Sequence, residues 1–332
     1  MWTSIYFCFR MPSLRAASRL LWMFEKEFVS WVQSRKKDAN RTRPRTHAAE
    51  TILLDIGDDA CVLAPNGLAT VVTTDTLCDQ VHFDTQEHAL QRIGHKSVSV
   101  SISDLLAMGA RPAHGVLTFF LPNTFSLEDA QQLYIGAEQV ANEHGIEITG
   151  GDTNRYEGPL IVGSTLIGYI QPDRIWPVNG AQVGDSILVT GELGGSILGH
   201  HLDFQPRTEW VQRIAQDFEI HAATDISDSL SLDLSYLLQQ SSVGGEIVQS
   251  EIPVSAAAEE LSRSSESSAL DHAMTDGEDF ELIIVAAPEN ATQILASAPN
   301  DVSLIGKVVQ QQGLWMVDNG EKKEIQPKGY IH

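Results

Sequence analysis

Apolar runs along the chain end at, or are interrupted by, acidic residues. Residues 69–72 are apolar or β-branched, which predicts a buried strand, and Thr73, Thr74 and Asp75 follow directly. Burying an unpaired carboxylate is costly, so Asp75 needs a cation, hydrogen-bond donors or water. A lone aspartate at this place would most simply cap a helix or a turn. Other apolar runs are likewise followed or interrupted by acidic residues, at positions 58–59, 104, 152, 225–228 and 278–279.

The same periodicity predicts a mixture of strands and helices. We expect strands at 51–54, 68–74, 115–121, 146–149, 160–170, 186–190 and 280–286. We expect helices at 126–144, 194–202, 229–240 and 290–298. Ser126 is the expected cap of the helix 126–144, Glu128 and Asp129 lie in its first turn, and Gly145 should end it.

Residues 96–110 carry two conflicting signals. Serine alternates with Val and Ile over 97–103, which is typical of a strand, whereas 105–108 continue as an apolar helix that Gly109 would end. We predict a helix throughout, in which the serines are small residues that permit close packing.

Charge and composition divide the chain into three parts. Residues 1–47 hold ten Lys or Arg and three Asp or Glu, which gives +7 and leaves −29 for the remainder of a chain of net charge −22. We expect 1–47 to be an N-terminal extension and linker, 48–172 a first domain and 173–332 a second. Residues 1–22 are expected to be a disordered extension or the product of a start codon assigned too far upstream, with an Arg-rich targeting segment as the alternative.

Composition also limits what the protein binds. A hydrophobic content of 42% and a charged content of 20% are values of a globular protein. The net charge of −22 argues against nucleic acid, and so acidic a body should bind anions through metal ions or backbone N–H groups. Cys8, Cys61 and Cys78 are too few and too scattered for a disulfide framework or a zinc site, which suits a cytoplasmic protein. No apolar run approaches the roughly 20 residues of a membrane helix.

The common nucleotide-binding motifs are missing from the sequence. It has neither the G-x-x-x-x-G-K-[ST] of P-loop enzymes nor the motif set of protein kinases. Residues 191–196, Gly-Glu-Leu-Gly-Gly-Ser, lie between a predicted strand and a predicted helix, where backbone N–H groups could hold a phosphate. A plain strand-to-helix turn is the commoner explanation of such a stretch.

Seven motifs occur in an order and spacing that resemble one enzyme family. They are Gly57-Asp58-Asp59-Ala60, Thr73-Thr74-Asp75 with Val81-His82-Phe83, Ser103 to Ala110, Gly150 to Arg155, Asp225-Ile226-Ser227-Asp228, Asp276 to Leu282, and the tail Gly329 to His332. Together they resemble the thiamine-monophosphate kinases, which belong to the superfamily of aminoimidazole-ribonucleotide synthetase and selenophosphate synthetase. The resemblance covers about residues 25–332 and includes Glu27-Phe28. Each motif alone is weak, and the set in register is specific.

This resemblance implies an α/β fold of the α+β type with two synthetase-like domains. The first would bind ATP and metal and would form a homodimer through a β-barrel built across the interface; the second is an α/β domain, with the active site between them. The implied reaction is ATP-dependent phosphorylation of thiamine monophosphate to thiamine diphosphate, with several Mg²⁺ ions. The attacking phosphate oxygen is already anionic, so no general base is needed, and Mg²⁺ screens the repulsion between the two phosphates.

The resemblance also implies which residues form the site. The metal ligands would be Asp59, Thr73, Thr74, Asp75, Asp104, Asp152, Asp225 and Asp228. The catalytic residues would be Asp75, Asp104, Asp152 and Asp228. The ATP contacts would be Tyr134, Gly151, Asp152 and Ser227, and the substrate contacts would be His82 and Glu278.

Simpler explanations compete for several residues. Asp58 is better explained as a turn residue, and His82 alone would be a half-buried structural histidine. Glu278 could pair with a nearby cation, and Tyr134 could pack in the core. Arg155 could grip a phosphate or form a structural ion pair.

Three positions depart from the family pattern. Ser229 stands where the family has Gly, and Val178 where it often has an Arg near the nucleotide. Pro327 stands where an aromatic ring stacks on the thiamine rings, although Trp315 or Tyr330 could supply that ring. These departures leave two alternatives: a related kinase or synthetase of the superfamily acting on another small substrate, or a nucleotide-binding paralogue without turnover.

Overall fold

The computed structural model describes residues 52–54, 61–63, 67–298 and 301–330. The predicted extension 1–47 and the predicted metal ligand Asp59 lie outside these residues. None of the described helices has both the length and the apolar content that a membrane span requires.

A six-stranded sheet is built from the first part of the described chain, in the order β1-β2-β3-β6-β4-β5. Its strands are β1 (Ile52–Leu54), β2 (Cys61–Leu63), β3 (Ala69–Cys78), β4 (Arg111–Pro122), β5 (Glu147–Tyr156) and β6 (Ile161–Ile170). β3 pairs antiparallel with β6 along its whole length, and β4 lies antiparallel to β6 and parallel to β5. The described strands leave the sheet open, so the barrel across a dimer interface stays a prediction.

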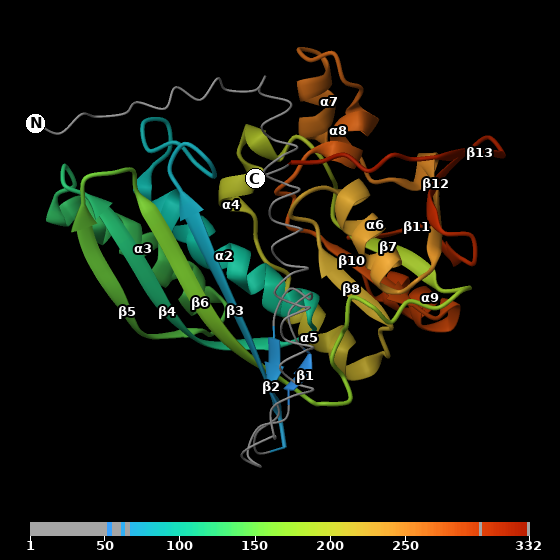
Figure 1. Ribbon diagram of the computed structural model, residues 1–332, viewed down its shortest axis with the longest axis horizontal. Helices are drawn as coiled ribbons and strands as arrows, with labels where there is room; N and C mark the ends of the chain where they lie inside the picture. Colours follow the sequence, from blue (N-terminus) through green and yellow to red (C-terminus); the bar gives the residue numbers. More distant parts are fainter. Residues whose placement is uncertain (1–51, 55–60, 64–66, 299–300, 331–332) are drawn as a thin grey trace, which may run out of the picture. The chain divides into compact units, whose positions relative to one another are not determined.

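Two helices, α2 (Leu90–Ala107) and α3 (Leu127–Glu143), cover one face of this sheet (Figure 1). The predicted helix over 96–110 is confirmed, although α2 begins earlier and ends at Ala107. Thirteen of its residues are buried, including four serines, because α2 lies between the sheet and α3. The close contact with α3 requires glycine: a Cβ on Gly94 would lie 1.9 Å from Leu133 O, and one on Gly136 would lie 1.9 Å from Gln91 O.

A seven-stranded sheet follows, in the order β13-β12-β9-β11-β7-β10-β8. Its strands are β7 (Ser186–Thr190), β8 (Ala222–Asp225), β9 (Gly244–Val248), β10 (Leu282–Ala286), β11 (Val302–Val309), β12 (Gly313–Asp318) and β13 (Glu321–Glu324). The helices of this part are α4 (His200–Asp203), α5 (Thr208–Asp217), α6 (Leu230–Gln240), α7 (Ala256–Ser262), α8 (Ala269–Thr275) and α9 (Pro288–Ser297), with 3₁₀ turns η1 (Ser196–Leu198) and η2 (Gln249–Glu251).

The predicted elements agree with the structure where their signals are long. Ser126 caps α3 in a reciprocal capping box with Asp129, as predicted. The predicted helix 194–202 is wrong in form: η1 and α4 take its place, separated by Gly199 at φ +135°. The predicted boundary at 172–177 falls in the connection between β6 and β7, and the division into domains stays a prediction.

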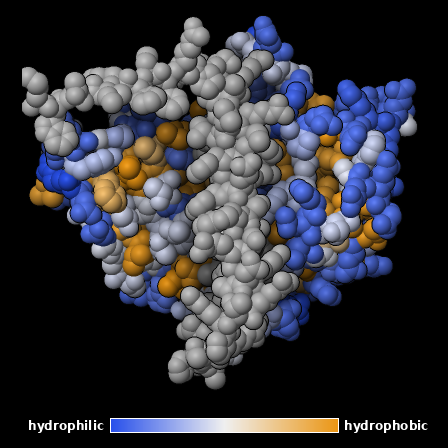
Figure 2. Space-filling model, viewed as in Figure 1, coloured by the Kyte–Doolittle hydropathy of each residue, from blue (hydrophilic) through white to orange (hydrophobic). Residues whose placement is uncertain are grey.

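One face of the first sheet carries no helix among the described residues. Apolar side chains gather over that face (Figure 2), where Val116, Phe120 and Tyr169 of β4 and β6 are between 36% and 38% exposed. Their neighbours Leu117 and Phe119 point the other way and are buried in the core. This alternation follows from the two-residue period of a strand.

Candidate active site

Three aspartates meet where α2 packs against β3 and β8. Thr73 and Asp75 lie on the same face of β3, Asp104 lies on α2, and Asp225 is the last residue of β8. Ser101 Oγ donates to Asp75 Oδ2 at 2.5 Å, Ser103 Oγ donates to Asp225 Oδ2 at 2.6 Å, and Thr73 Oγ1 donates to Asp104 Oδ2. Each carboxylate therefore has a hydroxyl donor from a neighbouring element.

No described Lys or Arg balances the negative charge of Asp75 or Asp225. Asp225 is 3% exposed, and burial together with the charges of Asp75 and Asp228 raises its pKa to about 6. Burial also raises the pKa of Asp75, against the opposing effect of the Ser101 hydrogen bond. Within the described residues, neither Asp75 nor Asp225 has a Lys or Arg within salt-bridge distance. A cation would relieve this repulsion and hold both carboxylates ionised.

The carboxylate oxygen atoms of the cluster fit a site for a magnesium–nucleotide complex better than a site in which the protein supplies all the metal ligands. Across the described part of the chain, no group of three or more His, Cys, Asp or Glu side chains is arranged to hold a metal ion. Mg²⁺ prefers carboxylate oxygens, keeps several waters, and is commonly held by one or two carboxylates together with substrate phosphates. Asp75 and Asp225, flanked by Asp104, match that donor set.

The loop before α6 brings Ser227 and Asp228 beside the cluster. Asp233 Oδ2 accepts hydrogen bonds from the backbone N–H groups of residues 227, 228 and 229, each at 3.0 Å. Burial and the charge of Asp228 raise the pKa of Asp233 well above its ordinary value. Ser229 caps α6 by accepting from Leu232 N, and its hydroxyl donates to Lys328 O at 2.7 Å. Ser229, which stands where the family has Gly, therefore has a structural role.

A groove of about 650 Å³ adjoins this loop and contains both predicted substrate residues, His82 and Glu278. His82 Nδ1 accepts from Cys78 N at 3.0 Å, so a neutral His82 carries its proton on Nε2. Glu278 Oε1 lies 2.6 Å from Lys96 Nζ. Glu278 N donates to Ser227 O at 2.8 Å, which connects the groove to the loop of Ser227 and Asp228, called the acidic loop below.

Tyr330 supplies an aromatic ring on the rim of this groove. Its hydroxyl donates to Val81 O at 3.2 Å, its N–H donates to Asp228 O at 3.0 Å, and the residue is 40% exposed. Pro327 lines a different cavity of about 300 Å³. Trp315 lies on β12, where Lys322 Nζ sits 4.5 Å from its ring centroid.

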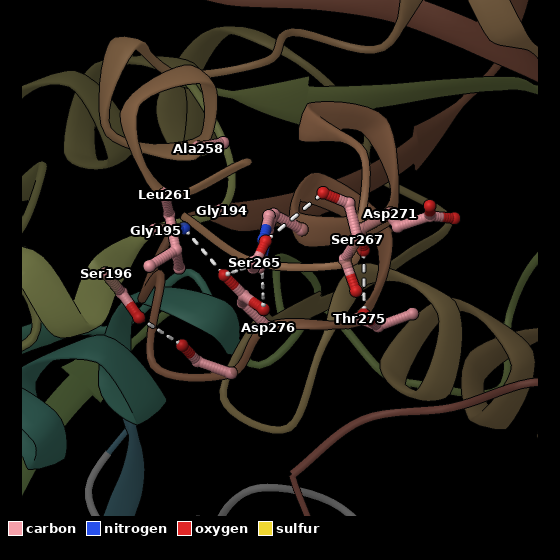
Figure 3. A network of polar contacts seen from close by, with 12 residues as sticks. Gly194, Gly195, Ser196, Ala258, Leu261, Ser265, Ser267, Asp271, Thr275 and Asp276 are labelled. Carbon is pink, nitrogen blue, oxygen red and sulfur yellow. Dashed lines mark hydrogen bonds and ion pairs between the residues drawn. The ribbon is translucent and has the colours of Figure 1, made fainter. Parts of the chain in front are cut away.

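The glycine-rich turn at 191–196 binds carboxylates of this chain. Gly194 N donates to Asp279 Oδ1 at 2.9 Å. Gly195 N donates to Asp276 Oδ2 at 2.8 Å (Figure 3). Asp276 is also paired with His272, whose other ring nitrogen lies 2.8 Å from Ser265 Oγ. Because these N–H groups are already paired, the structure favours the plain turn over the phosphate-binding loop.

Several predicted residues do not join the cluster. Thr74 points to the opposite face of β3 and lies 2.8 Å from Thr165 Oγ1. Asp152 lies on β5 with β6 and β4 between it and β3, roughly 14 Å away at ordinary strand spacing. Tyr134 is 38% exposed on α3, so it is not the core residue that the competing explanation required. Their functional roles stay predictions.

Three further positions have a structural explanation. Gly151 allows β5 to lie close to β4, since a Cβ there would lie 2.1 Å from Leu117 O. Arg155 donates to the carbonyls of Asn123 and Phe125 and forms no ion pair with a described residue, while its contact with a phosphate stays a prediction. Val178 is 4% exposed and belongs to the core of the second sheet.

The sequence analysis missed four residues that hold the site together. Ser101 and Ser103 bond to carboxylates, Asp233 positions the acidic loop, and Lys96 is fully buried beneath the groove. The sequence did contain a signal for Lys96 and the serines. They are polar residues within an otherwise apolar segment, the helix α2, which packs on both sides.

Comparisons with known proteins identify both parts of the chain. Residues 57–170 match the family model of the AIR synthase related protein N-terminal domain, and residues 182–318 match that of the C-terminal domain. A thiamine-monophosphate kinase of Rhodopirellula baltica is 38% identical over 300 residues, which cover 87% of this chain and 94% of the relative.

Solved structures with the same fold agree. The structure of AaThiL complexed with AMPPCP and TMP has a TM-score of 0.75 and 27% identity, covering 83% of this chain and 91% of that one. The thiamine-monophosphate kinase of Stenotrophomonas maltophilia K279a has a TM-score of 0.68 and 33% identity, covering 87% and 95%.

A buried histidine on the groove predicts a pH dependence of stability. His201 is 2% exposed and its Nδ1 lies 2.8 Å from Ser196 O. Burial lowers its pKa to about 4. The unfolded chain binds this proton near pH 6.5 and the folded one does not, so the contribution of His201 is present above pH 6.5 and is lost as the pH falls toward 4.

Urea unfolding measured between pH 7 and pH 4.5 checks this prediction. His201→Gln should flatten the pH dependence of the unfolding free energy, by up to about 3 kcal/mol across the window. An unchanged slope in the variant would show that His201 is not the titrating group.

Proposed function

The chain belongs to the thiamine-monophosphate kinase family, and we propose that it transfers the γ-phosphoryl group of ATP to thiamine monophosphate in a Mg²⁺-dependent reaction. The products are thiamine diphosphate and ADP. One observation supports the proposal most: the N–H groups of Glu278 and Tyr330 in the groove donate to the carbonyls of Ser227 and Asp228, so the groove adjoins the aspartate cluster.

On the phosphate side, the proposed ligands are the aspartates of the cluster. Asp75, Asp104 and Asp225, with Asp228 beside them, offer hard oxygen atoms, and Thr73 holds Asp104 in place. Bound Mg²⁺ supplies positive charge that screens the triphosphate and stabilises the charge on the transferring group. Asp59, Thr74 and Asp152 are proposed as further ligands on the strength of the family motifs alone.

On the acceptor side, the groove supplies groups of complementary kinds. His82 and Glu278 line the groove, where an imidazole suits a phosphate oxygen and a carboxylate suits an N–H donor of the substrate. Tyr330 supplies a ring that can stack on a cationic heterocycle. We therefore place the aromatic contact at Tyr330 rather than near Pro327, and the acceptor phosphate attacks without a general base because it is already anionic.

The nucleotide itself is proposed to contact Tyr134, Gly151, Asp152 and Ser227. Tyr134 and Asp152 are exposed on α3 and β5, so they are accessible to a ligand or a second subunit. The apolar face of the first sheet, which no described helix covers and which includes Val116 and Phe120, supports a homodimer formed through that face. A cytoplasmic location is proposed from the thiol content of the sequence.

The names of the relatives support the kinase over the other readings. Relatives that match most of the chain are named for this activity, and the similar AaThiL structure holds AMPPCP and TMP together. A superfamily member with another substrate, or a paralogue without turnover, has no comparable support.

Replacing one aspartate of the cluster tests the phosphate side. Asp75→Asn should lower kcat for thiamine monophosphate about 100-fold or more at saturating Mg²⁺, because it removes charge at the transferring phosphate. The melting temperature should stay equal or rise, since the change relieves repulsion with Asp225. Asp217→Asn, an exposed aspartate at the end of α5, is the control and should leave the rate unchanged. A near wild-type kcat in Asp75→Asn would remove this residue from the site.

A second pair of variants tests the position of the ring. Tyr330→Ala should raise the KM for thiamine monophosphate about tenfold, because stacking and cation–π contacts together contribute roughly 1–2 kcal/mol. The KM for ATP should change little. Pro327→Ala, on a separate cavity, is the matched control. The reverse result, with only Pro327→Ala affecting the acceptor KM, would place the heterocycle elsewhere.

A further inference from the structure

Lys96 is the one fully buried lysine among the described residues, and it lies directly beneath the proposed acceptor groove. Its side chain is 0% exposed on α2. Lysine is almost never fully buried unless it is paired, because removing an ammonium group from water is costly. In this chain burial lowers the pKa of Lys96, and the carboxylate of Glu278 acts in the opposite direction.

Both partners of the Lys96 ammonium group belong to the groove. Lys96 Nζ donates to Glu278 Oε1 at 2.6 Å and to His82 O at 2.7 Å. His82 comes from the loop after β3, and Glu278 comes from the segment before β10, so these groups are far apart in sequence. Lys96 is thus the link that holds the two sides of the groove in register from below.

The backbone at Glu278 depends on such a link. Glu278 has φ +62° and Phe280 has φ +49°, in the left-handed region that non-glycine residues seldom adopt. Strained backbone of this kind persists only where surrounding contacts fix it. The contacts that fix Glu278 are the Lys96 ion pair and the hydrogen bond from Glu278 N to Ser227 O.

We propose that Lys96 is a positioning residue for acceptor recognition, which acts through Glu278 and does not touch the substrate. Its ammonium group, held by the His82 carbonyl, neutralises Glu278 from the buried side and fixes the direction of the other carboxylate oxygen toward the groove. This inference rests on the proposed function of the groove as the acceptor site. It assigns no role to Lys96 at the metal–phosphate cluster.

A double-mutant cycle tests the assignment, with Lys96→Met, Glu278→Gln and the double variant. Lys96→Met should raise the KM for thiamine monophosphate about tenfold or more, the usual effect of losing a hydrogen bond to a charged group. The affinity for Mg²⁺-bound AMPPCP should stay within about threefold of wild type. In the Glu278→Gln background the same substitution should add no further loss in KM, because Lys96 acts through Glu278.

Removing one member of a buried pair can unfold a protein, so the double variant carries the test if Lys96→Met does not fold. It has no unpaired buried charge, and its KM should equal that of Glu278→Gln alone. Lys322→Met, which removes a surface partner of Glu246, is the matched control and should change neither constant.

Two outcomes would overturn the assignment. One is a folded Lys96→Met with wild-type KM; the other is a loss in the double variant that exceeds that of Glu278→Gln or extends to AMPPCP binding. If the wild-type protein turns over no thiamine monophosphate, the proposed function fails first and takes this inference with it. If the wild type turns over thiamine monophosphate and Lys96→Met has the same KM, only the proposed role of Lys96 fails.

Discussion

Buried carboxylates that lack a cation are the constraint around which this fold is arranged. Asp75 and Asp225 lie at the junction of a strand, a helix and a second strand, and each accepts a hydrogen bond from a serine hydroxyl of α2. A buried charge is tolerated when it is paired or neutralised, and burial, together with repulsion from Asp75 and Asp228, raises the pKa of Asp225 to about 6. The protein therefore retains an arrangement that is unfavourable without a ligand and becomes favourable when a cation binds.

The two sides of the site solve the charge problem differently. At the groove, Glu278 has a permanent partner in Lys96, so its carboxylate is held in one position before any ligand arrives. At the cluster, no lysine or arginine reaches Asp75 or Asp225 in the part of the chain described. Under the proposed function, a fixed cation at the cluster would compete with Mg²⁺, whereas a fixed cation under Glu278 would prepare the groove for the acceptor. The loop 227–229, held by Asp233, joins the two sides.

Much of the fold could be predicted because long elements carry redundant signals. The capping box at Ser126 and the buried helix α2 follow from local sequence, but two serines of α2, Ser101 and Ser103, donate to carboxylates, which their small size does not predict. The turn at 194–202 could not, because Gly194, Gly195 and Gly199 adopt positive φ angles that break the helix the apolar pattern suggested. Strands such as β8, with four residues, are too short for periodicity to detect.

The site was predictable in its residue types and less so in its geometry. Asp75, Asp104 and Asp225 converge because a strand, a helix and a second strand meet, which no local pattern encodes. Thr74 faces away from them because strand side chains alternate. The sequence left Trp315 and Tyr330 as alternatives for the ring that Pro327 lacks, and the path of the chain over α6 carries Tyr330 to the groove. Lys96 escaped notice because its partners are distant in sequence.

The central claim is that the aspartate cluster binds nucleotide only through divalent metal. Calorimetric titration of the full chain with AMPPCP, in Mg²⁺ and in EDTA, tests this most directly. We expect measurable binding in Mg²⁺ and a loss of about 100-fold or more in EDTA, since the triphosphate would meet carboxylates with no cation between them. Equal affinity in the two buffers would contradict the account.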